Sequence, residues 1–184
     1  MTNSTSDAIF ARRSVRAYTA QKVDDETVGL LARTALAAPS GMNAQPVNVI
    51  VVRNRALIEE AEKAVIAFFV KTGESAVVDR IKSRNNKIFY DAPVCFFLAV
   101  KNHADADVGI AAENISIAAT GLGLGSIILG LPRVIFNDPE TAAYWKGKLG
   151  FPDGCEFGLA VAAGYAADTG KPHDIDLKKI SFID

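Results

Sequence analysis

Apolar and polar positions along the chain follow two kinds of spacing, which predict helices interleaved with strands. Apolar residues three and four apart mark one set of segments, and short runs of β-branched and aromatic residues mark the other. The expected helices cover 7–12, 25–38, 56–71, part of 72–86, 107–122 and 139–149. The expected strands cover 47–52, 94–100, 126–129 and 157–163. Because the two kinds of element alternate irregularly, the pattern predicts a single α/β layered domain over 1–184 around a central sheet.

Three local features add detail to this prediction. Asp24 precedes the second helix and is expected to cap its first turn. The segment 107–122 carries small and apolar residues with almost no charge, so we expect that helix to be buried on nearly all sides. Cys95 and Cys155 each lie in an apolar run without metal-type spacing, and we expect both to be buried free thiols.

The composition excludes several classes of function. Apolar residues make up 49% of the chain and charged residues 22%, which is ordinary for a globular protein. The net charge of −1 gives no overall basic field for a nucleic acid. The first residues are polar and no apolar stretch has the length of a membrane span, so we expect a cytoplasmic protein that uses no membrane.

The Arg12–Arg16 segment is the first candidate for chemistry. In an extended backbone Arg12, Ser14 and Arg16 would project to one side, and Arg13 to the other. Two guanidinium groups and a hydroxyl on one side suit a phosphate or another dianion. A solvated basic turn that contacts nothing is the alternative reading of the same residues.

Three further segments carry weaker signals. The loop Pro39–Pro46 is bracketed by prolines and rich in short polar side chains. These side chains could contact the edge of a planar heterocycle, or they could only cap backbone groups in a helix-to-strand connection. The glycines at 121, 123 and 125 follow a helix and precede a strand, the reverse of a dinucleotide fingerprint, so we interpret them as a helix end. The tail Gly164–His173 carries a Lys and a His after a strand. These two residues could add positive charge to an anion site, or the segment could be a flexible charged tail.

Taken together and in this order, these segments resemble the nitroreductase family of FMN oxidoreductases. The family pattern has Arg-x-Ser-x-Arg/Lys after the first helix, then a Pro-Ser-x-x-Asn-x-Gln-Pro loop that leads into a strand. An alanine-rich helix with an Asn, ending in Gly-Leu-Gly, and a Gly-Tyr strand end with basic residues beyond it complete the pattern. The matching segments here are Arg12–Arg16, Pro39–Pro46, Asn114–Gly125 and Gly164–His173, and they span essentially the whole chain.

The resemblance implies a fold, a cofactor and a phosphate site. The fold would be a three-layer α/β/α sandwich of the α+β class, with a central mixed, mainly antiparallel sheet flanked by helices. FMN would be bound, and NADH or NADPH would donate electrons. Arg12 and Ser14 would hold the FMN phosphate with help from Arg13. Lys171 would add a basic contact, whereas His173 stands where many relatives carry a second basic residue.

Other residues would face the flavin ring. Arg16 would lie near the pyrimidine edge, where a cation stabilises the charge that develops on reduction. Asn85 is a second candidate for that edge. Ile128, Leu129 and Gly130 would pass a backbone segment along the face of the flavin.

The remaining site residues would come from a second copy of the chain. In the family, the loop residues that correspond to Pro39, Ser40, Gly41 and Asn43 reach the isoalloxazine of the neighbouring subunit. The resemblance therefore implies a homodimer with flavin sites at the subunit interface.

The implied function is transfer of hydride from NAD(P)H to FMN and then reduction of a nitroaromatic, a quinone or a related small-molecule acceptor, in a ping-pong mechanism. No catalytic side chain and no metal are implied, because the cofactor carries the chemistry.

Two alternatives to this function stay open. The chain between 68 and 94, where relatives build a substrate pocket, is short, which is compatible with a module that binds or stores FMN without nicotinamide-dependent turnover. The basic segments could also serve another phosphorylated ligand.

Overall fold

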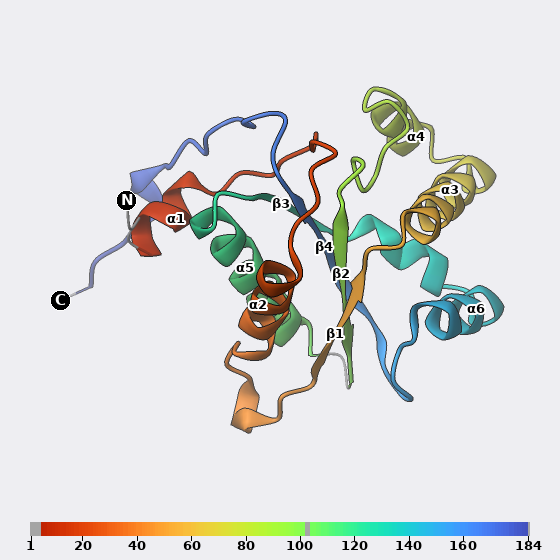
Figure 1. The fold of residues 1–184 in the computed structure, drawn as a ribbon, viewed down its shortest axis with the longest axis horizontal. Coiled ribbons are helices and arrows are strands. Elements are labelled where there is room, and N and C mark those ends of the chain that lie inside the picture. Colours follow the sequence, from red (N-terminus) through yellow and green to blue (C-terminus); the bar gives the residue numbers. More distant parts are fainter. Residues whose placement is uncertain (1–4, 102–103, 184) are drawn as a thin grey trace.

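A four-stranded sheet lies between two layers of helices (Figure 1). The computed structural model describes residues 5–101 and 104–183. The strands are β1 (Val47–Val52), β2 (Val94–Val100), β3 (Gly125–Leu129) and β4 (Glu156–Gly164), in the order β1-β2-β4-β3. The helices are α1 (Thr5–Ala11), α2 (Asp25–Leu36), α3 (Arg55–Thr72), α4 (Ser75–Lys82), α5 (Asp105–Gly121) and α6 (Pro139–Leu149). The predicted three-layer α+β arrangement is confirmed.

The named strands all pair antiparallel, and a parallel bridge between Ser14 and Ser126 adds the mixed character that was expected. Every residue of β2 is buried, because this strand lies between β1 and β4 and both of its faces are covered. Its side chains alternate between two cores. Cys95 and Phe97 pack toward α3 and α6, and Phe96 and Leu98 toward α2 and α5.

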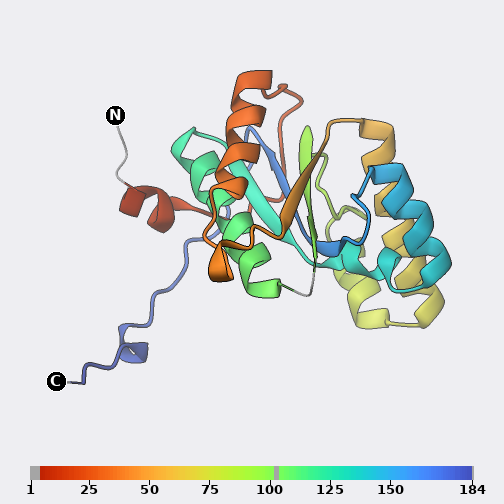
Figure 2. The same ribbon diagram turned by 90° about the horizontal axis from the view of Figure 1, so that it is seen from below.

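The α2 and α5 layer is only half covered within one chain. Asp24 caps α2 as predicted, since its Oδ1 accepts from the amide of Thr27 at 2.8 Å. The prediction that α5 is buried on nearly all sides holds only in part, because six of its residues are buried and the others, on its outer face and at its ends, are half-buried or exposed in the part of the chain that the structure describes (Figure 2). Ile110 on that face is 39% exposed, and Leu36 at the end of α2 is 57% exposed.

The opposite layer consists of α3 and α6, with α4 packed on α3. Between β3 and α6 the chain forms a 3₁₀ turn, Leu131–Phe136, that the sequence pattern did not predict. In this turn the ring of Phe136 stacks on Phe157 of β4, with centroids 4.9 Å apart. No helix within the described ranges is both long and apolar enough to cross a membrane.

Both cysteines are buried and free, as predicted. Burial raises the pKa of the Cys95 thiol well above its usual range, and the nearby carboxylate of Glu62 raises it further. An unfolded chain would release this thiol proton at about pH 8.5, whereas the folded chain keeps it. The contribution of Cys95 to stability is therefore complete below that pH and is lost progressively above it.

We expect the free energy of unfolding to fall by about 1.4 kcal/mol per pH unit between roughly pH 9 and 10 through this one group. Urea unfolding of the native chain and of Cys95→Ala across that range measures the effect, because the alanine variant lacks the titrating thiol. Equal pH slopes for the two proteins would show that Cys95 ionises alike in both states.

Candidate functional site

The segment Arg12–Tyr18 lies along β3 and the end of β4 as an added, strand-like edge. The amide of Val15 donates to the carbonyl of Ser126 at 3.0 Å, and Tyr18 forms an antiparallel bridge with Ala166. Val15 is buried, and the side chains on either side of it, Ser14 and Arg16, line one open pocket. The alternation predicted from an extended backbone therefore holds at these three residues.

Tyr18 fastens this edge to the sheet. Its hydroxyl donates toward the carbonyl of Ala162 on β4 at 3.1 Å and lies 3.3 Å from the carbonyl of Val15. Burial raises the pKa of Tyr18 far above its usual range, so the phenol stays protonated and keeps its role as a donor.

The pocket beside this edge, which we call the basic pocket, has a volume of about 480 Å³. Its walls come from the N-terminal edge and from the tail that follows β4: Ser14, Arg16, Asp168, Thr169, Gly170, Lys171 and His173. Gly170 adopts a φ of +59°, and a Cβ at that position would lie 3.1 Å from the Cβ of Arg13, so glycine lets the tail turn close to the edge. Among the described residues, neither Arg16 nor Lys171 has a carboxylate partner. The pocket thus offers two cations and a hydroxyl to an anion.

Arg12 and Arg13 stand behind this pocket rather than on its wall. The Arg12 Nε lies 3.3 Å from Oε1 of Glu113 on α5, and its Nη2 lies 2.9 Å from Nε2 of His173. Arg13 turns back to donate to the carbonyls of Phe10 and Arg12, at 2.6 and 2.8 Å, which are orphan acceptors at the end of α1.

A second opening, which we call the tyrosine pocket, adjoins the basic pocket through Arg16. It has a volume of about 180 Å³ and is lined by Arg16, Ala17, Tyr18, Arg84, Asn85, Lys87, Tyr90 and Asp91. Asn85 therefore lines the same opening as Arg16. Arg84 and Tyr90, which the sequence did not single out, are joined here by a hydrogen bond of 3.0 Å between Nη1 and the phenol oxygen.

Seven of the predicted residues lie away from both pockets. Pro39 and Ser40 line a small cavity at the far end of α2, and the 3₁₀ turn Gly41–Asn43 follows them at the bottom of Figure 1. Leu129 packs in the core on the α3 and α6 side, Ile128 is half-buried on the other side, and Gly130 is exposed. Within one chain the structure does not bring these residues to Arg16.

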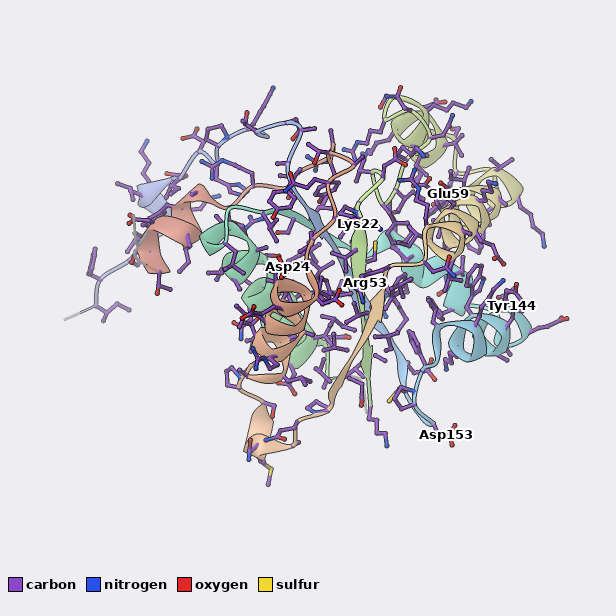
Figure 3. All side chains as sticks on the ribbon, viewed as in Figure 1. Lys22, Asp24, Arg53, Glu59, Tyr144 and Asp153 are labelled. Carbon is purple, nitrogen blue, oxygen red and sulfur yellow. The ribbon has the colours of Figure 1, made fainter. Side chains whose placement is uncertain are left out.

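The largest remaining opening has a different electrostatic character. It has a volume of about 520 Å³ and lies between the start of α2 and the end of β1, where Lys22 and Arg53 stand near Asp24 (Figure 3). Arg53 forms an ion pair with Asp25, so two carboxylates balance two cations there. In residues 5–101 and 104–183 no group of His, Cys, Asp and Glu side chains is arranged to hold a metal ion.

Two buried or paired carboxylates near the pockets escaped the sequence reasoning for physical reasons. Glu113 meets Arg12 across about one hundred residues of sequence, and nothing in the helical pattern of α5 indicates that pairing. Glu62 occupies an apolar position of α3 and is buried, a placement that only the fold of the 84–91 segment explains. The sequence does place Glu62 on the same face of the helix as the apolar positions Ala61 and Val65, and this pattern could have indicated a buried glutamate.

The structure defines an α+β sandwich with a pocket at the edge of its sheet whose lining residues suit an anionic ligand. Comparison with known proteins narrows this description. Residues 9–165 match the family model described as Nitroreductase family. The chain belongs to the nitroreductase family.

Solved structures give the same result over the full length. A nitroreductase with bound FMN from Desulfitobacterium hafniense DCB-2 is 34% identical, with a TM-score of 0.94 and complete coverage of both chains. A nitroreductase with bound FMN from Bacteroides fragilis NCTC 9343 is 27% identical, with a TM-score of 0.87 and again complete coverage of both.

A curated relative matches over a shorter segment. The putative NADH dehydrogenase/NAD(P)H nitroreductase of Archaeoglobus fulgidus is 38% identical over 56 residues, which is 30% of this chain and 32% of that protein. The matched segment thus spans about a third of the length of this relative.

Proposed function

We propose that this chain is an FMN-dependent oxidoreductase that takes hydride from NADH or NADPH and passes electrons to a small-molecule acceptor in a ping-pong mechanism. The observation that carries the proposal is the basic pocket beside Arg16, in a chain whose full-length relatives include nitroreductases with bound FMN. Nitroaromatics, quinones and related compounds are the acceptors that we propose. The donor assignment is supported by the Archaeoglobus fulgidus relative, whose name includes NAD(P)H.

The residues present fit the chemistry of FMN. A phosphate needs hydrogen-bond donors and positive charge, and Ser14, Lys171 and His173 supply them in one open pocket. The carboxylate of Asp168 lines the same pocket and suits a hydroxyl of a ribityl chain better than a phosphate oxygen. When bound, FMN would accept a hydride and later release two electrons, which no side chain of this pocket can do.

We propose a division of work between two arginines. Arg12, held between Glu113 and His173, would turn from these partners toward the phosphate or act on it through His173. Arg16 lies between the basic pocket and the tyrosine pocket, so it would contact the ring edge and stabilise negative charge there. Asn85 would donate or accept at the same edge, and Arg13 would contribute only through its backbone because its side chain caps α1.

We also propose that the site is completed by a second copy of the chain. Among the described residues, 12 of the 15 exposed large hydrophobic side chains lie on α1, α2, α5 with its C-cap Leu122, the turn after α2 and the C-terminal tail. These elements lie on one side of the molecule in Figure 1. The basic pocket is lined by the segment that follows α1 and by the start of the C-terminal tail. A partner packed there would cover Ile110 and Phe182 and bring its own Pro39, Ser40, Gly41 and Asn43 toward the ring.

The decisive test is the spectrum of the purified protein. We expect a yellow protein with absorbance near roughly 450 nm, the value for any oxidised flavin, and bleaching of that band when NADH or NADPH is added without oxygen. Stopped-flow mixing measures the rate. A bound flavin that neither nucleotide reduces would support a storage module, and a colourless protein that takes up no FMN would support another phosphorylated ligand.

The two arginines should differ when each is replaced by alanine. Arg16→Ala should lower the flavin reduction potential and slow reduction while FMN is retained, because the cation at the ring edge is lost. Arg12→Ala should weaken FMN binding about tenfold, the size expected for one charge-assisted hydrogen bond. Arg53→Ala, in the charge-balanced opening, is the matched control. Equal losses of affinity and potential in the first two variants would contradict the assigned roles.

The proposed dimer predicts opposite outcomes for two exposed aliphatic residues. Ile110→Asp on the outer face of α5 should convert the dimer into a monomer that retains little flavin, because a carboxylate would be buried without a partner. Val70→Asp on α3, on the other side of the sheet, should leave the dimer and its flavin unchanged. Light scattering of both variants measures the mass. A native chain that is monomeric and retains flavin fully would refute the shared site.

A further inference from the structure

The carboxylate of Glu62 is buried beneath the tyrosine pocket. It is the one carboxylate of the described residues that is classed as buried, with 7% of its surface exposed. A carboxylate is taken out of water at high cost unless hydrogen bonds satisfy it, so its partners indicate its role. Oε2 accepts from the amide of Ile88 at 2.6 Å and from the amide of Phe89 at 3.1 Å, and Oε1 lies 3.6 Å from Nζ of Lys87.

These partners belong to a strained segment, residues 84–91, which links α4 to the entry of β2. Four non-glycine residues there have left-handed backbones, with φ of +55° at Asn85, +56° at Asn86, +56° at Tyr90 and +61° at Asp91. Such conformations persist only where the surroundings impose them, and a tyrosine adopts them rarely. The side chain of Glu62 binds the backbone amides of Ile88 and Phe89, which lie in the middle of this segment between the two strained pairs.

The strained segment forms one wall of the tyrosine pocket, and Arg16 and Tyr18 form the facing wall. Arg84, Asn85 and Tyr90 all line this opening, whereas Glu62 does not. The segment rises beside the Arg12–Tyr18 edge in Figure 1, between α4 and β2. The carboxylate is therefore bonded to the backbone between residues that line the pocket, without lining the pocket itself.

We propose that Glu62 is a positioning residue for the flavin ring, which fixes Asn85 and Arg84 opposite Arg16. The proposal rests on the proposed function, since it assigns the ring edge to this pocket. Without the carboxylate two buried amides lose their acceptor, and the flanking residues relax toward ordinary right-handed backbones. Asn85 and Arg84 then leave the ring edge, and the reduced ring loses donors that stabilise its charge.

The sign of one measurement separates positioning from a simple charge effect. A negative charge near the ring disfavours the reduced, anionic form, so removing that charge alone would raise the flavin potential. Loss of the donors that Glu62 positions would lower the potential instead. The two explanations thus predict shifts in opposite directions for the same variant.

The experiment compares Glu62→Ala and Glu62→Gln with Glu60→Ala and Glu60→Gln in the full-length protein. Glu60 lies on the same helix but contacts Tyr144 and Lys148 of α6, away from the strained segment. Three quantities are measured: the flavin potential, the dissociation constant for FMN, and the inhibition of FMN binding by inorganic phosphate, which probes the basic pocket alone.

We expect Glu62→Ala to lower the potential and to weaken FMN binding about tenfold, as for one lost buried acceptor, with phosphate inhibition unchanged. Glu62→Gln keeps an oxygen that can accept from both amides, as Oε2 does, so it should retain FMN binding near the native level, and its potential should rise because only the charge is lost. Glu62→Leu, which fills the space but offers no acceptor, takes the place of the alanine variant if that variant does not fold. Both Glu60 variants should match the native protein. A raised or unchanged potential in the variant without an acceptor, or FMN binding in Glu62→Gln as weak as in that variant, would overturn the proposal. A native chain that binds no FMN would refute the proposed function itself.

Discussion

The pairing of the Arg12–Tyr18 edge with β3 and the end of β4 is the contact on which the site depends. It converts a basic segment that could have been a solvated turn into a fixed row, in which Val15 is buried and Ser14 and Arg16 face the basic pocket. The tail after β4 then passes close to this row because Gly170 permits the turn. Both walls of the pocket are thus consequences of hydrogen bonds at one end of a single sheet.

Much of this arrangement could be predicted from the sequence, because the strands and helices have clear periodic patterns. The run Val94–Val100 is continuously apolar, and it is the strand with both faces covered. The 3₁₀ turn Leu131–Phe136 was missed because its apolar residues follow neither a helical nor a strand period. The burial of α5 was overestimated because a helix that is apolar all round looks the same whether its outer face is covered by its own chain or left open.

The candidate site shows the same limit more sharply. Alternation along an extended backbone was enough to place Ser14 and Arg16 together, since that inference needs only local geometry. The partners of Arg12 could not be predicted, because Glu113 and His173 come from a helix and a tail that are distant in sequence. The loop Pro39–Pro46 remains apart from the pockets of its own chain, so its role as part of a neighbour's site stays a prediction.

The same edge pairing has a consequence for how the protein is made. Ser14 bridges Ser126, and Arg12 reaches His173, 161 positions later in the chain. The two walls of the basic pocket are therefore synthesised at different times, because most of the given sequence separates them. A chain still under synthesis has the arginines but no tail to oppose them. An anionic ligand that needs both walls can bind only after the segment that carries Lys171 and His173 has been made and has folded against the edge, so such a ligand cannot template the early steps of folding.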